Sequence, residues 1–405
     1  MIVFAGAVLV LPDRVIDAGS IVVGDGRIQS IHEGAIEKPA GATYFDLAGH
    51  VIVPGFIDVH VHGVEGVDVL DDEEAVARVA AILPKYGVTA FCPTSIACTP
   101  ETLAALLAGV HRARGARAPG SARVLPAHLE SNFINPEFTG AQPETCLRLP
   151  PRGAQRARRA PGAPAESAFT GDEILAVIAK ERSSVGIVTL APELPGGIEL
   201  VRDLVKHGHR VSLGHTGATY DEARAAIDAG ARHATHLFNR MSLISSRAPG
   251  VTGAVLESDA VAAELICDGV HVHPALMSMA IRAKSARRMM AITDGTAGAG
   301  LPAGSRTRIG GRAIVVTDRC ALLEDGTLAG SILSMDGAFR TLVNVVKLSL
   351  PDASRMCATT PAEELGLADC GSIAVGKTAD LVVLTRDLRV RHTVVNGENR
   401  ELRLN

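Results

Sequence analysis

The chain has 405 residues, and its 47% hydrophobic content is enough to build a large core. A net charge of -4 and a pI near 6.4 give no reason to expect nucleic acid or an anionic membrane as a partner. Only 3% of residues are aromatic and none is Trp, which removes the usual stacking platform for single-stranded nucleic acid. Seven cysteines without a Cys-x-x-Cys pair favour reduced thiols and a cytoplasmic protein. The apolar N-terminus lacks a basic region and is shorter than a membrane span, so we interpret it as a strand.

The two ends of the chain have the same β-type pattern and no helical segment nearby. Short apolar runs that are typical of strands occur at 2–11, 20–23, 27–31, 43–47, 381–384 and 390–395. Gly24-Asp25-Gly26 and Asn396-Gly397 are hairpin signals between or after these runs. The pattern predicts one small β-sandwich domain built from residues 1–53 and 366–405.

Between these ends, apolar strands alternate with helical patterns. The predicted strands are 51–62, 88–95, 123–130, 186–193, 210–216, 233–239, 262–268 and 289–294. The predicted helices are 72–86, 100–113, 172–183, 197–208, 219–229, 250–258, 274–286 and 335–349. Eight such units in series predict an α/β fold, a (β/α)8 TIM-like barrel over residues 54–365, with its active site at the C-terminal ends of the strands.

Two insertions interrupt the alternation. Residues 298–330 contain several glycines and a β-like run at 313–317, which indicates a hairpin excursion after the last barrel strand. Residues 148–171 are rich in Arg, Pro, Ala and Gly, and we interpret them as a surface loop, with phosphate binding as the weaker alternative. The arginines concerned are Arg152, Arg156, Arg158 and Arg159.

Metal-binding residue types recur where the predicted strands end. His60 and His62 leave the same face of the first strand, because a strand repeats every two residues. Later strands end in the remaining candidates, which are Glu130, His215, His236 and Asp294. In a barrel these ends converge on one cavity, and this set of nitrogen and oxygen donors suits zinc or a similar divalent ion. The sequence therefore predicts a metal site at this end of the barrel, where a bound ion would lower the pKa of its water and supply hydroxide at neutral pH.

The order of these motifs resembles the amidohydrolase superfamily and, within it, the N-acetylglucosamine-6-phosphate deacetylases of amino-sugar catabolism. The resemblance covers almost the whole chain and is carried by Pro54-Gly-Phe-Ile-Asp-Val-His-Val-His62, Pro93-Thr94, His128-Leu-Glu130, Leu190-Ala-Pro-Glu193, Gly214-His215, Ala218-Thr219, Ala234-Thr-His-Leu-Phe-Asn239, Arg247-x-Pro-Gly250, Asp268-Gly-Val-His271, Thr293-Asp294 and Gly326-Thr-Leu-x-Gly-Ser331. The Thr-His-Leu-Phe-Asn and Asp-Gly-x-His segments together are more specific than the His-x-His segment, which many amidohydrolases share.

The resemblance implies a role for each matching residue. Glu130, His215 and His236 correspond to the ligands of the principal metal, His60 and His62 to a branch that can hold a second ion, and Asp294 to the catalytic acid/base. The implied metal is zinc, with iron, manganese or cobalt as alternatives and one or two ions per subunit. The implied contacts to a small-molecule sugar phosphate are Ala141, Gln142, Asn239, Arg240, Arg247, His271, Leu328, Ala329 and Gly330. A homodimer is also implied.

The sequence departs from the family pattern at three places. Glu130 is followed by Ser131-Asn132 rather than Gly-Pro, and Gln142 stands where some relatives have a His thought to polarise the carbonyl. Arg240 replaces a small residue and adds positive charge beside the expected phosphate pocket. The alternatives that stay open are a deacetylase of N-acetylgalactosamine 6-phosphate, another amidohydrolase that cleaves an N-acyl or cyclic amide, and a non-catalytic sugar-phosphate-binding relative.

Overall fold

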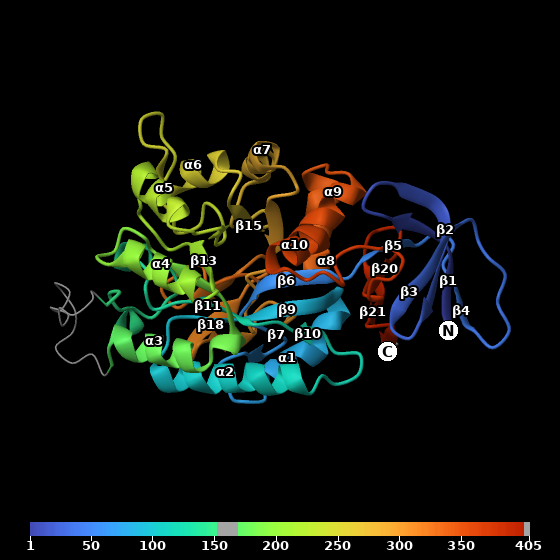
Figure 1. The fold of residues 1–405 in the computed structure, drawn as a ribbon, viewed down its shortest axis with the longest axis horizontal. Coiled ribbons are helices and arrows are strands. Elements are labelled where there is room, and N and C mark those ends of the chain that lie inside the picture. The colour runs from blue at the N-terminus through green and yellow to red at the C-terminus, as the bar shows by residue number, and fades with distance from the viewer. Residues whose placement is uncertain (152–168, 401–405) are drawn as a thin grey trace.

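The computed structural model describes residues 1–151 and 169–400. Figure 1 shows a barrel surrounded by helices, with a layer of strands from both ends of the chain beside it. The arginines at 152, 156, 158 and 159, which belong to the predicted surface loop, lie outside the described residues. No helix within these two ranges is both long and apolar enough to cross a membrane.

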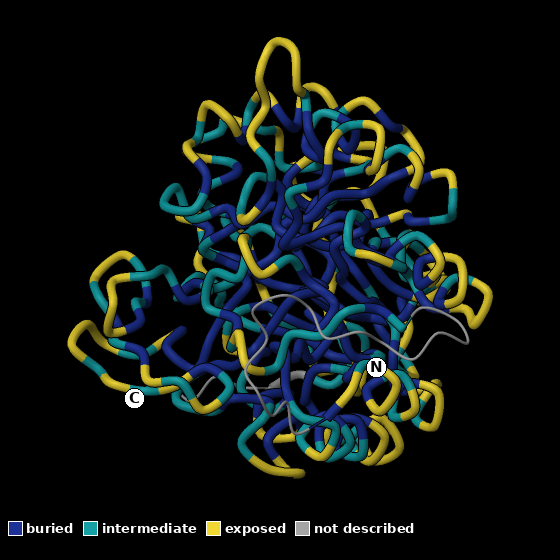
Figure 2. Tube along the Cα trace, turned by 90° about the vertical axis from the view of Figure 1, so that its left-hand side faces the viewer, coloured by how far each residue is buried: buried dark blue, intermediate teal, exposed yellow. Residues whose placement is uncertain are grey.

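Eight parallel strands form the nearly closed barrel that the sequence predicts. In order around the barrel they are β6 (Phe56–Val61), β9 (Val88–Ser95), β11 (Ala127–Glu130), β12 (Val185–Leu190), β13 (Arg210–Leu213), β14 (His233–Ala234), β15 (Ala262–Ile266) and β16 (Met289–Ile292). The barrel closes between β16 and β6, where Val61 bridges to Gly295 and the Asp294 N–H donates to the His60 carbonyl at 3.0 Å. The strands are almost continuously apolar because both of their faces are buried, as the dark core in Figure 2 shows.

Two of the predicted strands are each broken in two. The run 51–62 divides at Gly55 into β5 (Val51–Pro54), which joins the terminal sheet, and β6, which joins the barrel. The run 123–130 divides into β10 (Arg123–Val124) and β11. Pro126 lies in the second gap and has no N–H to donate to a neighbouring strand, which explains the interruption.

The eight predicted helices are all present. They are α1 (Ala75–Ile82), α2 (Pro100–Gly115), α3 (Gly171–Lys180), α4 (Gly197–Lys206), α5 (Tyr220–Asp228), α6 (Gly250–Glu257), α7 (Pro274–Lys284) and α8 (Met335–Arg340). Capping boxes at Thr170–Glu173 and Thr219–Glu222 start α3 and α5, so the local sequence fixes where these helices begin. Two further short helices, α9 (Leu350–Ser354) and α10 (Thr360–Leu365), were not predicted.

Strands from both chain ends form one eight-stranded sheet, in agreement with the predicted β domain. The sheet consists of β1 (Ile2–Val10), β2 (Val15–Gly24), β3 (Arg27–Glu33), β4 (Thr43–Asp46), β5, β20 (Leu381–Leu384), β21 (Val390–Val395) and β22 (Glu398–Arg400). Its strands enclose one apolar core that contains Leu9, Ile21, Ile28, Leu381 and Val394. The N- and C-terminal labels in Figure 1 both lie at this sheet.

The predicted hairpin excursion is a small antiparallel sheet beside the carboxyl ends of the barrel strands. It contains β17 (Arg306–Ile309), β18 (Arg312–Val316) and β19 (Ala321–Leu323). Ile309 and Ile314 pack with Ile96, the residue after β9, and with Ala329. This contact fixes residues 328–330 near the mouth of the barrel. A further pair, β7 (Gly63–Val64) and β8 (Val67–Asp68), follows β6.

Gly55 provides a test of the junction between the two sheets. A Cβ atom there would lie 2.3 Å from Thr89 Oγ1 and 2.4 Å from its Cγ2, so Thr89 would have to move. We expect Gly55→Ala to lower the free energy of unfolding by about 1–3 kcal/mol in urea denaturation. Gly115→Ala is the matched control, because no heavy atom lies within 4 Å of the place that its new methyl group would occupy. Equal stability of the two variants would contradict the close packing.

Candidate metal centre

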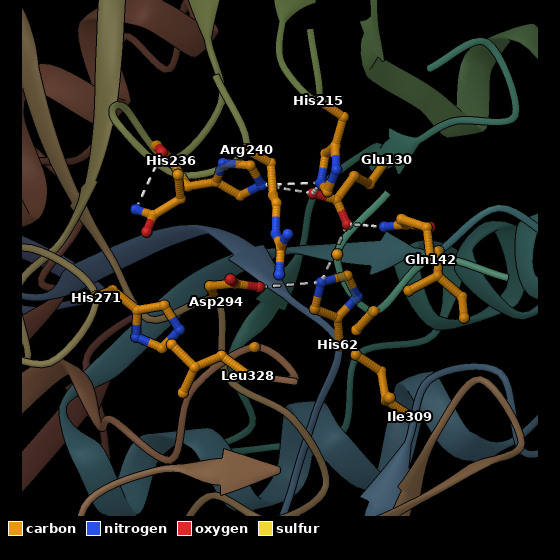
Figure 3. Close-up of a pocket in the computed structure, with 15 residues that line it drawn as sticks. His62, Glu130, Gln142, His215, His236, Arg240, His271, Asp294, Ile309 and Leu328 are labelled. Atoms are coloured by element: carbon orange, nitrogen blue, oxygen red, sulfur yellow. Dashed lines mark hydrogen bonds and ion pairs between the residues drawn. The ribbon is translucent and has the colours of Figure 1, made fainter. Parts of the chain in front are cut away.

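The six candidate residues for metal chemistry come together at the carboxyl ends of the barrel strands. His60 and His62 lie at the end of β6, Glu130 ends β11, and the others follow β13, β14 and β16. All six are almost completely buried. All of them except His60 line one pocket (Figure 3). The residues that line the pocket are His62, Ile96, Glu130, Gly140, Ala141, Gln142, His215, His236, Asn239, Arg240, His271, Asp294, Ile309, Leu328 and Gly330.

Glu130, His215 and His236 form the tightest group. Glu130 Oε1 lies 2.7 Å from His215 Nε2 and 2.8 Å from His236 Nε2, and the two imidazole nitrogens are 3.1 Å apart. Three donor atoms from three different strands therefore surround one point, and each residue offers one ligand atom within 4.8 Å of the others. Neutral imidazole and carboxylate at this spacing are the donor set that zinc and related divalent ions bind.

His60, His62 and Asp294 form a second group beside the first. Asp294 Oδ1 lies 3.1 Å from His62 Nε2 and 3.4 Å from His60 Nε2. The two imidazole Nε2 atoms are 3.2 Å apart. Glu130 links the groups, because its oxygens lie 3.9 Å from His60 Nε2 and 3.7 Å from His62 Nε2. The distances leave Glu130 as a possible ligand to ions on either side.

Outer hydrogen bonds turn three of the four imidazoles so that Nε2 faces the cluster. His60 Nδ1 lies 2.9 Å from Glu264 Oε2, His62 Nδ1 lies 3.0 Å from the Thr94 carbonyl, and His215 Nδ1 lies 2.7 Å from the Phe138 carbonyl. Metal-binding histidines ordinarily donate their second N–H in this way, which fixes the tautomer. His236 differs, since its buried Nδ1 has no hydrogen-bond partner within residues 1–151 and 169–400. These residues fit a divalent cation.

The backbone at the strand ends is strained where it presents the site. His215, His236 and Asp294 have φ values of 49°, 30° and 50°, in the left-handed region that residues with a Cβ seldom adopt. Each of the three lies two residues beyond its strand, so the chain turns sharply at the point where the side chain enters the pocket. Strain of this kind persists only where the surroundings hold it, and it is concentrated at functional sites.

The electrostatics of the cluster keep both carboxylates ionised. Burial raises the pKa of Glu130, but His215, His236 and His60 together hold it well below its usual value. Burial likewise opposes ionisation of Asp294, and His60 and His62 outweigh it, so its pKa is lowered. Burial also opposes protonation of His60, but Glu264, Asp294 and Glu130 raise its pKa to about 10.

The structure places seven of the nine predicted substrate contacts in the pocket, namely Ala141, Gln142, Asn239, Arg240, His271, Leu328 and Gly330. Gln142 Oε1 accepts from the Ala97 N–H at 2.7 Å, and its Nε2 donates to Glu130 Oε2. Asp268 Oδ2 lies 2.7 Å from His271 Nδ1 and holds that ring. Both residues are therefore fixed in orientation where they line the pocket.

Two predicted contacts are not in this pocket. Ala329 is buried, and its N–H donates to the Ala321 carbonyl at 3.0 Å, so only its neighbours reach the cavity. Arg247 is exposed and is absent from the residues described as lining the pocket. It lies in a turn that Ser245 and Ala248 close with hydrogen bonds of 3.0 and 3.1 Å. The contact of Arg247 with substrate therefore stays a prediction.

Sequence reasoning missed two buried acids. Glu264 lies in the middle of β15 and Asp58 in β6, and neither is exposed. Asp58 accepts a 2.6 Å hydrogen bond from Thr293 Oγ1, and burial raises its pKa to about 7. A usable signal existed for both, because an acidic residue inside an otherwise apolar strand is rare unless it is paired.

Comparison with known proteins gives a consistent picture. A model described as "Amidohydrolase family" matches residues 51–400. The chain is 34% identical to the N-acetylglucosamine-6-phosphate deacetylase of Bacillus subtilis, over 96% of this chain and 94% of that protein. It is 32% identical to the N-acetylgalactosamine-6-phosphate deacetylase of Escherichia coli O157:H7, over 95% of each. The crystal structure of N-acetylglucosamine-6-phosphate deacetylase from Pasteurella multocida superposes with a TM-score of 0.87 at 30% identity, covering 98% of this chain and 99% of that one.

Proton competition provides a test of the metal centre. Because the pKa of His60 is about 10, its ring is protonated on both nitrogens at neutral pH in metal-free protein. An ion that binds one of these nitrogens must displace the proton on it. We expect the affinity of chelator-treated protein for Zn²⁺ to rise with pH from 6 to 9, by about tenfold per pH unit for each proton released. Calorimetric titration in two buffers of different ionisation enthalpy counts the protons. Affinity that does not change with pH would exclude these histidines as ligands.

Proposed function

The chain belongs to the amidohydrolase family, and on that premise we propose that it hydrolyses the acetamide of N-acetylglucosamine 6-phosphate to glucosamine 6-phosphate and acetate. The observation that carries this proposal is the convergence of Glu130, His215 and His236 on one point, with Asp294 facing them across the pocket. In this proposal residues 54–365 form the hydrolase domain, and residues 1–53 with 366–405 form the β domain. We also propose that the enzyme is cytoplasmic, because seven cysteines without a Cys-x-x-Cys pair favour reduced thiols.

We assign the principal ion to Glu130, His215 and His236, and a second ion to His60 and His62. Zinc suits the nitrogen and oxygen donors best, and iron, manganese or cobalt would also accept them. A bound ion supplies Lewis acidity and lowers the pKa of water from ~15.7 toward ~7. The outer hydrogen bonds to the imidazoles support this assignment, because they leave Nε2 free to bind.

Asp294 has the position and charge that a general base requires. Its carboxylate is ionised and lies 3.1 Å from His62 Nε2 in the pocket. Its backbone is held from both sides, by the His60 carbonyl at 3.0 Å and the Ser331 N–H at 2.7 Å. Asp294 takes a proton from water as the water oxygen bonds to the acetyl carbon, then passes it to the nitrogen as the C–N bond breaks. The amine leaves neutral, and the acetic acid that remains loses the second proton of the water to Asp294 or to solvent, which gives acetate.

The pocket also contains groups suited to a sugar phosphate. Arg240 and His271 lie on its wall, and the Arg240 side chain extends into the cavity in Figure 3. A guanidinium binds phosphate oxygens through two parallel hydrogen bonds, so Arg240, which lines the pocket, is well placed to bind the 6-phosphate. Gln142 and Asn239, with the backbone at Leu328 and Gly330, would orient the sugar ring and the acetamide.

We propose a homodimer in which Arg247 contacts the substrate of the neighbouring subunit. Arg247 is exposed and does not line the pocket of its own chain, which supports a contact with substrate in a second chain. Leu243 and Ile244 in the same segment are 85% and 52% exposed. Apolar side chains this exposed beside an arginine are typical of a protein interface.

A second candidate substrate is N-acetylgalactosamine 6-phosphate. The relative from Escherichia coli O157:H7 that carries that name is nearly as similar to this chain as the glucosamine enzyme from Bacillus subtilis. The two sugars differ only in the configuration of one hydroxyl group. The same phosphate and metal sites would therefore accept either sugar. Cyclic amidases that bridge two metals with a carboxylated lysine are less suitable, because β12 and the residues that follow it, to Glu193, contain no Lys.

The role of Asp294 is tested by Asp294→Asn. An amide cannot accept the proton, so we expect turnover to fall by roughly 10²–10⁴-fold while metal content stays unchanged. Acetate release and metal analysis measure the two effects separately. Asp318→Asn is the matched control, since this exposed carboxylate does not line the pocket. Near-normal turnover of Asp294→Asn would reject the acid/base role.

The phosphate site is tested by comparing phosphorylated and free sugars. We expect kcat/KM for the 6-phosphate to exceed that for free N-acetylglucosamine by at least about 100-fold, because charge-assisted bidentate hydrogen bonds are lost with the free sugar. Arg240→Met should narrow that ratio, while Arg319→Met, at an exposed arginine outside the pocket, should not. Equal kcat/KM for the two sugars would defeat the phosphate pocket. The same assay with the galacto-configured phosphate decides between the two candidate substrates.

A further inference from the structure

A buried carboxylate lies beneath the metal-binding groups, and the proposed reaction does not use it. Glu264, in the middle of β15, has no solvent exposure. Its Oε2 lies 2.9 Å from His60 Nδ1 and accepts from the His236 N–H at 3.2 Å. Its Oε1 lies 2.9 Å from His233 Nε2 and 3.5 Å from His128 Nδ1.

Such a group is costly to bury, which makes its partners informative. An ionised carboxylate removed from water needs several hydrogen-bond donors or a nearby positive charge to persist. Glu264 obtains these from His60, His233 and the main chain of His236, and two of those three residues are candidate metal ligands. An apolar residue at position 264 would fill the same space without the cost of burying a charge. We therefore attribute the presence of the carboxylate to its contacts with the candidate ligands.

Glu264 does not form a metal site of its own with the histidines around it. Donor atoms of His60, His128 and Glu264 lie within 4.8 Å of one another. Both ring nitrogens of His128 are already occupied, however, because Nδ1 lies 3.0 Å from the Val59 carbonyl and Nε2 lies 2.7 Å from Thr189 Oγ1. All three residues are completely buried in the barrel. Glu264 therefore acts through the residues that it touches.

We propose that Glu264 is a positioning residue that braces both metal-binding groups from below. It holds the proton of His60 on Nδ1, which leaves the Nε2 lone pair facing the pocket, and it anchors the main chain of His236 in its left-handed conformation. The inference rests on the proposed ligand set and adds to it a residue with no contact to substrate. The side-chain contact is with His60, whereas His236 is held only through its backbone. An ion at His60 and His62 is therefore more sensitive to Glu264 than an ion at Glu130, His215 and His236.

Glu264→Gln tests this role while preserving shape. The amide oxygen still accepts from His60 and from the His236 main chain, but the negative charge that makes His60 a better ligand is lost. We expect the affinity for an ion at His60 and His62 to fall by about 10- to 100-fold, the range for outer partners of metal ligands. Competition with a chelating dye and metal analysis after dialysis measure this on the whole protein without reference to deacetylation. Glu264→Asp retains the charge and should recover part of the affinity.

His233→Gln is the matched control, because His233 contacts Glu264 Oε1 but none of the candidate ligands through its side chain. It disturbs the same buried network, so we expect a similar loss of thermal stability with zinc affinity within about threefold of the native protein. Equal loss of affinity in both variants would reduce Glu264 to a structural residue and overturn the proposal. Native affinity in Glu264→Gln would do the same. If Glu264→Gln does not fold, Glu264→Asp replaces it in the test. Native zinc affinity of Glu264→Asp, together with lowered thermal stability, would also reject the positioning role of Glu264.

These outcomes are separable from the proposed function. Acetate release from the native enzyme tests the reaction, and the zinc affinity of the variants tests the positioning role of Glu264. A native enzyme that releases acetate from the sugar phosphate while Glu264→Gln binds zinc normally would retain the function and reject the inference. If the native protein has no deacetylase activity but Glu264→Gln binds zinc more weakly than the native protein, the inference is retained and the proposed function is rejected.

Discussion

One carboxylate oxygen organises this molecule. Glu130 Oε1 lies within 2.8 Å of imidazole nitrogens of two residues that follow other strands, and all three side chains are almost completely buried. Three polar atoms that approach so closely in a buried site have a large desolvation cost, and a shared cation is the partner that offsets it. The barrel, its short strands and the left-handed residues at their ends can be understood as the scaffold that holds this arrangement.

That scaffold depends on where the barrel closes. Asp58 accepts hydrogen bonds from Thr293 Oγ1 at 2.6 Å and from the Thr293 N–H at 3.3 Å, which ties β6 to the end of β16. The next residue, Asp294, donates its N–H to the His60 carbonyl. The proposed base and the two histidines of the second group are thus held by the same seam. An enzyme that moves protons over one hydrogen-bond length needs this rigidity, because small displacements reduce the rate steeply.

Much of this arrangement could be predicted from the sequence. The eight strands, the helices and the residues at the strand ends are encoded locally, by apolar runs that stop at His, Glu or Asp. The break at Pro126 and the division at Gly55 are also local, but periodicity alone overlooks them. Arg247 was inferred from resemblance alone, and it is exposed and not among the residues that line the pocket. Glu264 was missed because its importance depends on three partners distant in sequence, which only the closed barrel brings together.

The most direct test of the account is to locate the metal. Crystals of the zinc-loaded protein measured on both sides of the zinc absorption edge reveal each ion by its anomalous difference. The account predicts a peak about 2.0–2.2 Å from Glu130, His215 and His236 together, the bond length expected for nitrogen and oxygen ligands of zinc. A peak confined to surface histidines, or no peak among these three residues in protein that hydrolyses the sugar phosphate, would contradict it.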